Sequence, residues 1–149
     1  MSRKSKLIKT AVAVPVAVVA LLATMHMGMM ASRPKPPSSE FGYGPRTSVN
    51  GQYQVTILET ARFQKGKLLN TTILVAGQDG KGIQGLQIGV DGGMPQHGHG
   101  LPTKPRVTQD LGSGRYQVQG LKFNMGGWWE LKFIIAGAAN DSVVFNLDL

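Results

Sequence analysis

Two histidines and their neighbouring methionines are the residues of this sequence best suited to chemistry. His97 and His99 lie two positions apart in a glycine- and proline-rich segment, residues 92–107, and Met94 precedes the first of them by three positions. Side chains two residues apart in an extended segment point to the same side. Imidazole suits copper and zinc, and the soft thioether of methionine selects Cu(I). The pattern therefore predicts a copper site with His97, His99 and Met94 as ligands.

Three residues near this loop extend the copper hypothesis. Met125 lies just before an expected strand, and a hairpin partner would bring it across to the loop as a fourth ligand. Asp91 is placed to orient a ligand from outside the coordination shell. Trp128 is expected either to be exposed or to cover the histidine loop, where its indole would shield the metal from water.

The same loop has a structural interpretation. Proline restricts the backbone and glycine permits unusual angles, so together they can specify one turn. The two imidazoles would then bond to backbone carbonyl groups, and the two methionines would fill the core. The expected cofactor is therefore copper if the loop binds a metal, and there is none if the loop is only a turn. The residues that would specify the turn are Pro95, Gly98, Gly100 and Pro102.

The composition excludes several classes of protein. There is no cysteine, which removes disulfides, zinc–thiolate sites and cysteine nucleophiles. The sequence has no Gly-x-Ser-x-Gly motif, no phosphate-binding loop and no close pair among its 8 acidic residues, so we predict that the protein is not an enzyme. The basic residues are scattered without interleaved aromatic residues, so no nucleic-acid partner is expected.

The N-terminus carries the signal for localisation. A basic tip, residues 1–10, precedes an apolar run without charge, residues 11–31. As a helix rising about 1.5 Å per residue, this run would cross a hydrocarbon core of about 30 Å. The basic tip stays inside, so the rest of the chain is expected to be translocated. The alternative is a signal peptide cleaved after Ala31, which would place Met29 where a small residue is usual.

The remainder divides into a linker and a β domain. Residues 32–51 are rich in proline, glycine and serine and are expected to be an extended spacer. From residue 52 to residue 149, apolar and polar residues alternate with the period of half-buried strands. Turn formers separate these runs at residues 79–82, 91–93, 112–114 and 139–142. The pattern predicts an antiparallel β-sandwich of about seven strands after one N-terminal hydrophobic helix.

An ordered series of short motifs resembles the YtkA-like/FixH-like family over roughly residues 52–149. Where that family usually has Met-Pro-Gly-x-Trp, this chain has Met125-Gly126-Gly127-Trp128, whose backbone is less rigid. The other matching motifs are MPQHGHGLPT from Met94, Pro105, Val107, Gly114-Arg115-Tyr116, Gly120-Leu121, Phe123 and Glu130-Leu131.

The resemblance implies an immunoglobulin-like sandwich outside the cytoplasm, commonly behind one membrane anchor. The family's Met-Pro-x-His-x-His positions correspond to Met94, Pro95, His97 and His99, and better-known members accompany oxidase assembly and copper delivery. We therefore expect a single-span protein of a bacterial inner membrane with a periplasmic domain, or an exported domain. Its partner would be a membrane complex such as an oxidase or copper transporter. The alternative is a metal-free structural or protein-interaction module of the cell envelope.

Overall fold

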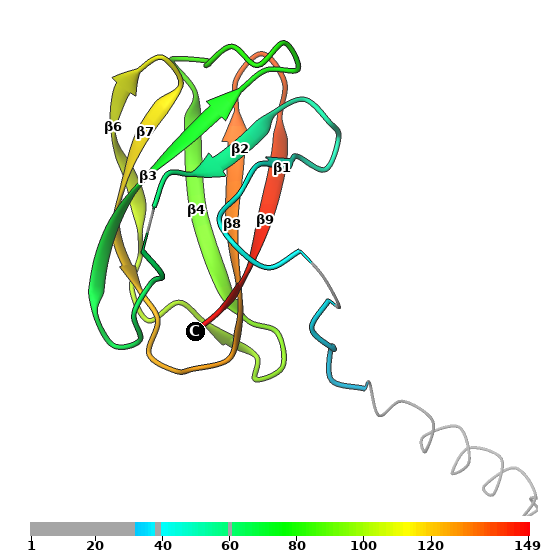
Figure 1. Ribbon diagram of the computed structural model, residues 1–149, viewed down its shortest axis with the longest axis vertical. Helices are drawn as coiled ribbons and strands as arrows, with labels where there is room; N and C mark the ends of the chain where they lie inside the picture. Colours follow the sequence, from blue (N-terminus) through cyan, green and yellow to red (C-terminus); the bar gives the residue numbers. More distant parts are fainter. Residues whose placement is uncertain (1–31, 38–39, 60) are drawn as a thin grey trace, which may run out of the picture. The chain divides into compact units, whose positions relative to one another are not determined.

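The computed structural model describes residues 32–37, 40–59 and 61–149 (Figure 1). Residues from Arg33 onward form one compact unit. The expected helix at residues 11–31 lies outside the described residues. Within the described part of the chain, no helix has the length and apolar character of a membrane span.

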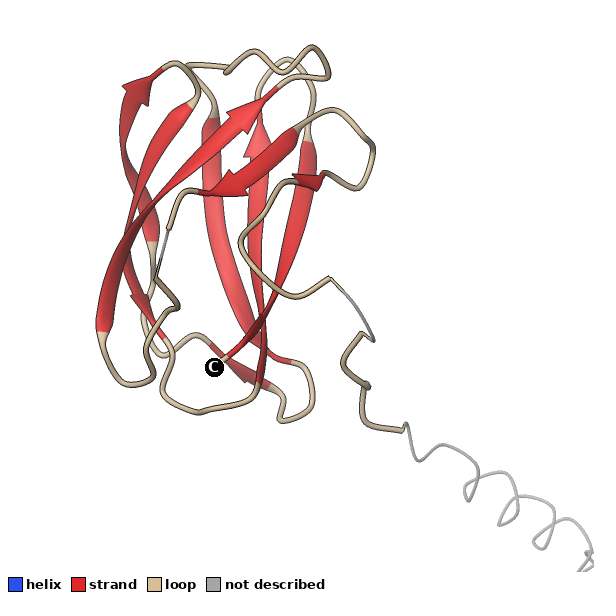
Figure 2. Cartoon of the chain, viewed as in Figure 1, coloured by secondary structure: helices blue, strands red, loops and turns tan. Residues whose placement is uncertain are grey.

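Nine described strands form two antiparallel sheets (Figure 2). The predicted all-β, immunoglobulin-like sandwich is therefore confirmed, and two of its strands are only two residues long. One sheet contains, in spatial order, β1 (Arg46–Thr47), β2 (Gln54–Ile57), β3 (Leu68–Ala76), β7 (Arg115–Lys122) and β6 (Arg106–Gly112). The other contains β5 (His99–Gly100), β4 (Gln87–Met94), β8 (Trp128–Ala136) and β9 (Asp141–Asp148).

The core lies between the two sheets and follows the alternation of the sequence. Successive side chains of a strand point to opposite faces, so one half of each pattern is buried. In β8 the buried half includes Trp129, Leu131 and Phe133, which are fully covered. The Phe123 ring packs edge-on against Trp129 with ring centroids 5.3 Å apart. Period-two alternation along the sequence predicts that Tyr116 and Trp129 point inward, and both lie in the core.

The predicted turn at residues 91–93 is wrong, because these residues continue β4 to its end. A Cβ atom on Gly92 would lie 2.5 Å from the carbonyl oxygen of Glu130 in β8. A Cβ atom on Gly93 would lie 2.5 Å from the carbonyl oxygen of His99 in β5. The two glycines therefore serve close approach between strands, which a side chain at either position would prevent.

The segment before β2 is held against β9. The Gly42 N–H donates to the Asn146 carbonyl group at 3.0 Å, and the Val49 N–H donates to the Ser142 carbonyl group at 2.8 Å. The chain thus enters the sandwich beside the end of its last strand. That end also holds the loops 58–67, 95–98, 101–105 and 123–127, and it is called the hairpin end below (the lower end in Figure 1).

Candidate metal centre at the histidine hairpin

The predicted histidine loop is a tight hairpin between β4 and β5. The Met94 carbonyl group accepts hydrogen bonds from the N–H groups of His97, at 3.0 Å, and Gly98, at 2.9 Å. Gly98 has φ +64°, a left-handed conformation that glycine adopts without strain. Pairing resumes between Met94 and His99. These residues, 94–100, are called the histidine hairpin, and its backbone is fixed by its own hydrogen bonds.

The two imidazoles lie side by side on the surface of this hairpin. Their rings are parallel within 2°, with centroids 6.1 Å apart. Both His97 and His99 are exposed, and neither ring hydrogen-bonds to any group in the part of the chain that the structure describes. The backbone alone fixes the turn, so the imidazole nitrogens remain available to a ligand.

The ring separation can be compared with that required by a shared metal. A metal ion bound by two imidazoles lies about 2 Å from each nitrogen, which puts the two ring centroids at most roughly 6 to 6.5 Å apart. The observed 6.1 Å is at the upper end of this range. His97 and His99 can therefore share one ion when their ring nitrogens turn toward each other.

Met94 faces the core and not the solvent. Its side chain is only 1% exposed, and its methyl group lies 3.4 Å from the position of a Cβ atom on Gly127. It nevertheless lines the groove beside the histidine hairpin. A thioether in this position reaches a surface-bound ion only if the side chain changes rotamer.

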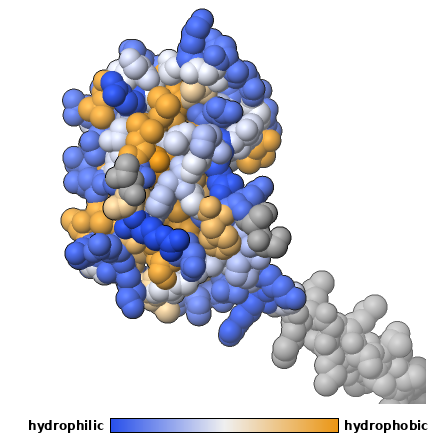
Figure 3. Space-filling view, viewed as in Figure 1, coloured by the Kyte–Doolittle hydropathy of each residue, from blue (hydrophilic) through white to orange (hydrophobic). Residues whose placement is uncertain are grey.

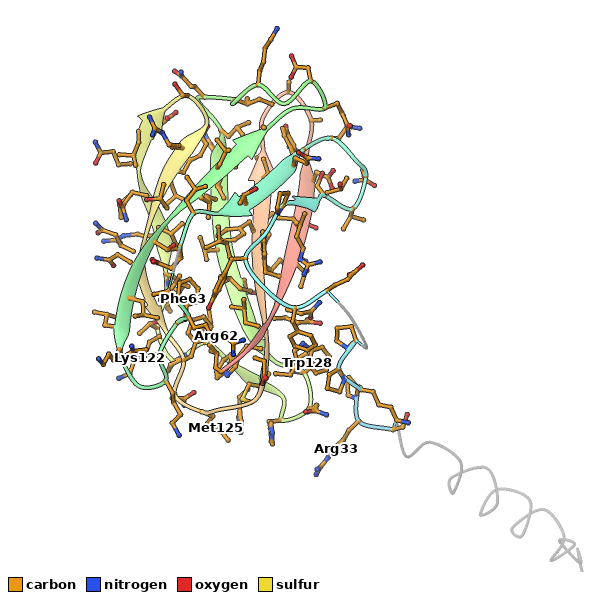
Figure 4. The ribbon with its side chains drawn as sticks, in the orientation of Figure 1. Arg33, Arg62, Phe63, Lys122, Met125 and Trp128 are labelled. Carbon is orange, nitrogen blue, oxygen red and sulfur yellow. The ribbon has the colours of Figure 1, made fainter. Side chains whose placement is uncertain are left out.

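Met125 and Trp128 are placed by the loop between β7 and β8. Met125 is 36% exposed, and its carbonyl group accepts a hydrogen bond from the Trp129 indole N–H at 3.0 Å. Trp128 is 7% exposed, and its indole N–H donates to Asn146 Oδ1 at 2.8 Å. Figure 4 shows both residues at the hairpin end. The indole of Trp128 is thus bonded to β9, on the opposite side of β8 from β4.

A shallow groove runs beside the histidine hairpin on the outer face of the four-stranded sheet. Asp91 contributes to it, and its carboxylate accepts a hydrogen bond from the Gly92 N–H at 2.7 Å. Within the described residues, no group of three or more His, Cys, Asp or Glu side chains is arranged to hold a metal ion. Any metal here would therefore depend on the two imidazoles, with thioether or external ligands completing its coordination.

The prediction from sequence missed two charged residues of this groove, Glu130 and Lys132, both in β8. They are the polar half of the alternation that places Trp129 and Leu131 in the core. Lys132 pairs across the strands with Asp91. The alternation predicted that both side chains face outward, but only the register between β4 and β8 places them beside the histidine hairpin.

Comparison with known proteins identifies a family for this chain. The model of the YtkA-like family matches residues 47–133, more than half of the sequence. No curated protein matches this chain. The solved structure of the ZirS C-terminal domain is 18% identical, with a TM-score of 0.41 over 78% of this chain and 82% of that one. The family match covers eight of the nine described strands, wholly or in part, and it includes the whole histidine hairpin. The chain belongs to the YtkA-like family.

Proposed function

We propose that this protein is a membrane-anchored accessory domain of the cell envelope whose histidine hairpin binds copper during the assembly of a membrane complex such as a respiratory oxidase. Membership of the YtkA-like family favours a non-catalytic accessory domain. The apolar run at residues 11–31 would provide the anchor, with the domain in the periplasm. In this proposal copper is cargo that the domain binds and passes on.

One observation carries the copper part of the proposal. His97 and His99 are exposed and free of hydrogen bonds within the described structure, and their rings lie 6.1 Å apart on a hairpin whose backbone is already fixed. Ordering such a site costs little conformational entropy, because the main chain does not have to be rearranged on binding. Imidazole is a good ligand for copper, and nearby thioethers would favour its Cu(I) state.

The direct test is a copper titration of the full chain in detergent, for Cu(I) and Cu(II) separately. We expect a dissociation constant below about one micromolar, equivalent to about 8 kcal/mol. The His97→Ala/His99→Ala variant should lose this binding while its circular dichroism spectrum stays unchanged. The matched control is Gln96→Ala/Lys104→Ala, which alters the same region and leaves both imidazoles in place.

The titration also tests the methionines. Met94→Leu keeps the volume of a buried side chain and should cost less than about 1.5 kcal/mol of stability. Weaker Cu(I) binding with unchanged Cu(II) binding in this variant would identify the thioether as a ligand. Met125→Leu makes the same comparison at an exposed position. Equal copper binding by the wild type and the double histidine variant would contradict the copper proposal altogether.

A second candidate function is favoured by the groove beside the histidine hairpin. Asp91, Glu130 and Lys132 place charges of both signs around an open surface, as in a contact that binds a protein through complementary charge. If the domain is a metal-free interaction module, a membrane protein should co-purify with the full chain. Asp91→Lys or Lys132→Glu should abolish that co-purification. His97→Ala/His99→Ala would leave that complex intact, whereas copper transfer requires both histidines.

A further inference from the structure

Positive charge is concentrated at one end of the sandwich. Among the described residues, the strand ends and loops of the hairpin end carry Arg62, Lys65, Lys67, Lys104, Arg106 and Lys122, against Glu59, Glu130 and Asp148. The opposite end carries Asp79, Asp110 and Asp141 against Lys81 and Arg115. The domain therefore has a strong charge asymmetry along its long axis, and a negative partner would be attracted to the hairpin end.

Two of these basic residues, Lys67 and Lys122, are neighbours of the exposed side chain of Leu68. Leu68 is 68% exposed beside Lys67, and it pairs across the strands with Lys122. The Gly66 N–H donates to the Phe123 carbonyl group at 2.6 Å, which joins the two loops. Figure 4 shows Lys122 and Met125 at this end, and Figure 3 shows apolar side chains there among hydrophilic ones. The set Lys65, Lys67, Leu68, Lys122 and Met125 is called the lysine patch.

Among the residues that the structure describes, the charges of the lysine patch have no ion-pair partner. The described residues contain two ion pairs, Arg46 with Glu40 and Lys81 with Asp79, and neither involves the lysine patch. The lysine patch thus combines three ammonium groups with two exposed apolar side chains, a composition that suits an anionic surface with an apolar interior. Lysines bind the anionic head groups of such a surface, and the apolar side chains enter its acyl boundary.

The chain enters the sandwich at the end that carries the lysine patch. The segment that precedes the sandwich joins it at the hairpin end, through the bond from Gly42 to Asn146. Residues 32–40 separate the apolar run from that point, and nine residues of extended chain reach about 30 Å. A domain tethered so closely meets the bilayer at a high effective concentration, so even weak attraction would hold it there.

We propose that the lysine patch docks on anionic phospholipid head groups, with the Leu68 and Met125 side chains at the level of the glycerol backbone. This proposal rests on the membrane anchor proposed above, but it is independent of copper. The docked domain would hold the histidine hairpin close to the bilayer, within reach of the extramembrane surface of a membrane protein.

The absence of cysteine from the sequence allows a site-specific test on the full chain. Asn124→Cys in the 123–127 loop and Ala138→Cys at the opposite end each accept one environment-sensitive fluorophore. Each labelled protein is placed in nanodiscs of phosphatidylcholine alone or mixed with phosphatidylglycerol. We expect the Asn124 label, and not the Ala138 label, to shift to the blue and become severalfold less accessible to acrylamide in the anionic discs. High salt should reverse both effects.

Charge variants connect this signal to the lysine patch. Each lysine near an anionic surface strengthens binding by roughly fivefold, so Lys65→Gln/Lys67→Gln should return the Asn124 label to its accessibility in neutral discs. Lys81→Gln/Arg115→Gln removes the same charge at the opposite end and should preserve the protection. Leu68→Ser should reduce the blue shift.

Two results would overturn the proposal: equal acrylamide access in neutral and anionic discs, or equal effects of the two charge variants. Co-elution of the chain with the lipid of the nanodiscs tests the membrane anchor separately from the lysine patch. A chain that fails to co-elute is mixed with vesicles of the same two compositions, and the Asn124 label then reports docking in the same way. Failure of the anchor and failure of the lysine patch therefore give different results.

Discussion

At the scale of single residues, Asp141 joins the first turn of the sandwich to the beginning of its last strand. Its buried carboxylate accepts a hydrogen bond from the Ser48 hydroxyl at 2.6 Å. Burial raises the pKa of Asp141, but the bonds from Ser48 and the backbone outweigh burial and lower the pKa to about 2. The backbone donors are the N–H groups of Asn50, Ser142 and Gln52.

Asp141→Asn should therefore destabilise the domain and change its response to acid. The pKa of Asp141 in the folded state lies below the value of about 3.9 in an unfolded chain. Its contribution to stability is thus complete above about pH 4 and is lost as the pH falls through about 2. Urea unfolding of wild type and variant at neutral pH and at pH values between 4 and 2 measures this contribution. A constant difference between them over that range would contradict the assignment.

The sequence predicted which residues point inward better than it predicted what covers the outward ones. Period-two alternation placed Trp129 in the core but left Trp128 either exposed or over the histidine loop. Trp128 follows the alternation onto the other face of β8, yet it is buried, and its indole N–H donates to Asn146 of the next strand. That contact depends on the register between β8 and β9, which no local pattern specifies.

At the scale of the strand pair, the histidine hairpin depends on the absence of a side chain in β4. Gly93→Ala would place a Cβ atom 2.5 Å from the His99 carbonyl oxygen and should separate β5 from β4. We expect weaker copper binding and faster hydrogen exchange of the Leu101 N–H, which donates to Gly92 at 3.1 Å. The urea midpoint should change little, because β5 has two residues.

Gly100→Ala is the control for that variant. A Cβ atom there would meet its nearest atom, the Gly92 carbonyl oxygen, at 3.8 Å, an ordinary contact. The copper binding of this variant and the hydrogen exchange of its Leu101 N–H should match those of the wild type. If both alanine variants behaved alike, the close approach at Gly93 would not be what holds the two imidazoles together.

The turn between β6 and β7 gives a second comparison of two glycines. Gly112 and Gly114 have φ +81° and φ +76°, so alanine at either position adopts a strained left-handed conformation that costs about 1–2 kcal/mol. A Cβ atom on Gly114 would also collide with the Val75 carbonyl group and lie 2.6 Å from the Cα atom of Gly82. Gly114→Ala should therefore unfold at lower urea than Gly112→Ala, whose Cβ meets nothing within 4 Å.

Strand β6 and the wrongly predicted turn at residues 91–93 show why the sequence did not predict every strand and turn. Glycines and prolines made residues 92–107 look like one loop, although Gly92, Gly93 and Met94 belong to a strand. Strand β6 has little alternation, because most of its side chains are exposed and its register shifts twice against β7. Glycine used for close packing and glycine used for a turn are identical in sequence, and only the neighbouring strand distinguishes them.

At the scale of the whole molecule, the burial pattern of β8 predicts how stability is distributed. Leu131 is fully buried between the sheets, whereas Ile134 is 48% exposed on the outer face of the same strand. Leu131→Ala should cost about 2–5 kcal/mol, the usual range for a leucine removed from a core. Ile134→Ala should stay within about 0.5 kcal/mol. The difference in their free energies of unfolding, from urea titration, checks which face of the sheet is the core.

The pairing of residues 41–49 with β9 has a consequence for the order in which the molecule can fold. A chain emerges from the ribosome or the translocon with its N-terminus first, yet β9 follows every other described strand. The hydrogen bonds of Gly42, Ser48 and Val49 to β9 can therefore form only after residues about one hundred positions later have been made. Such non-local closure is slow. The half-made sandwich would expose the edge of β8 until β9 arrives, and nascent chains stalled before Asp141 should be open to proteases and to strand exchange.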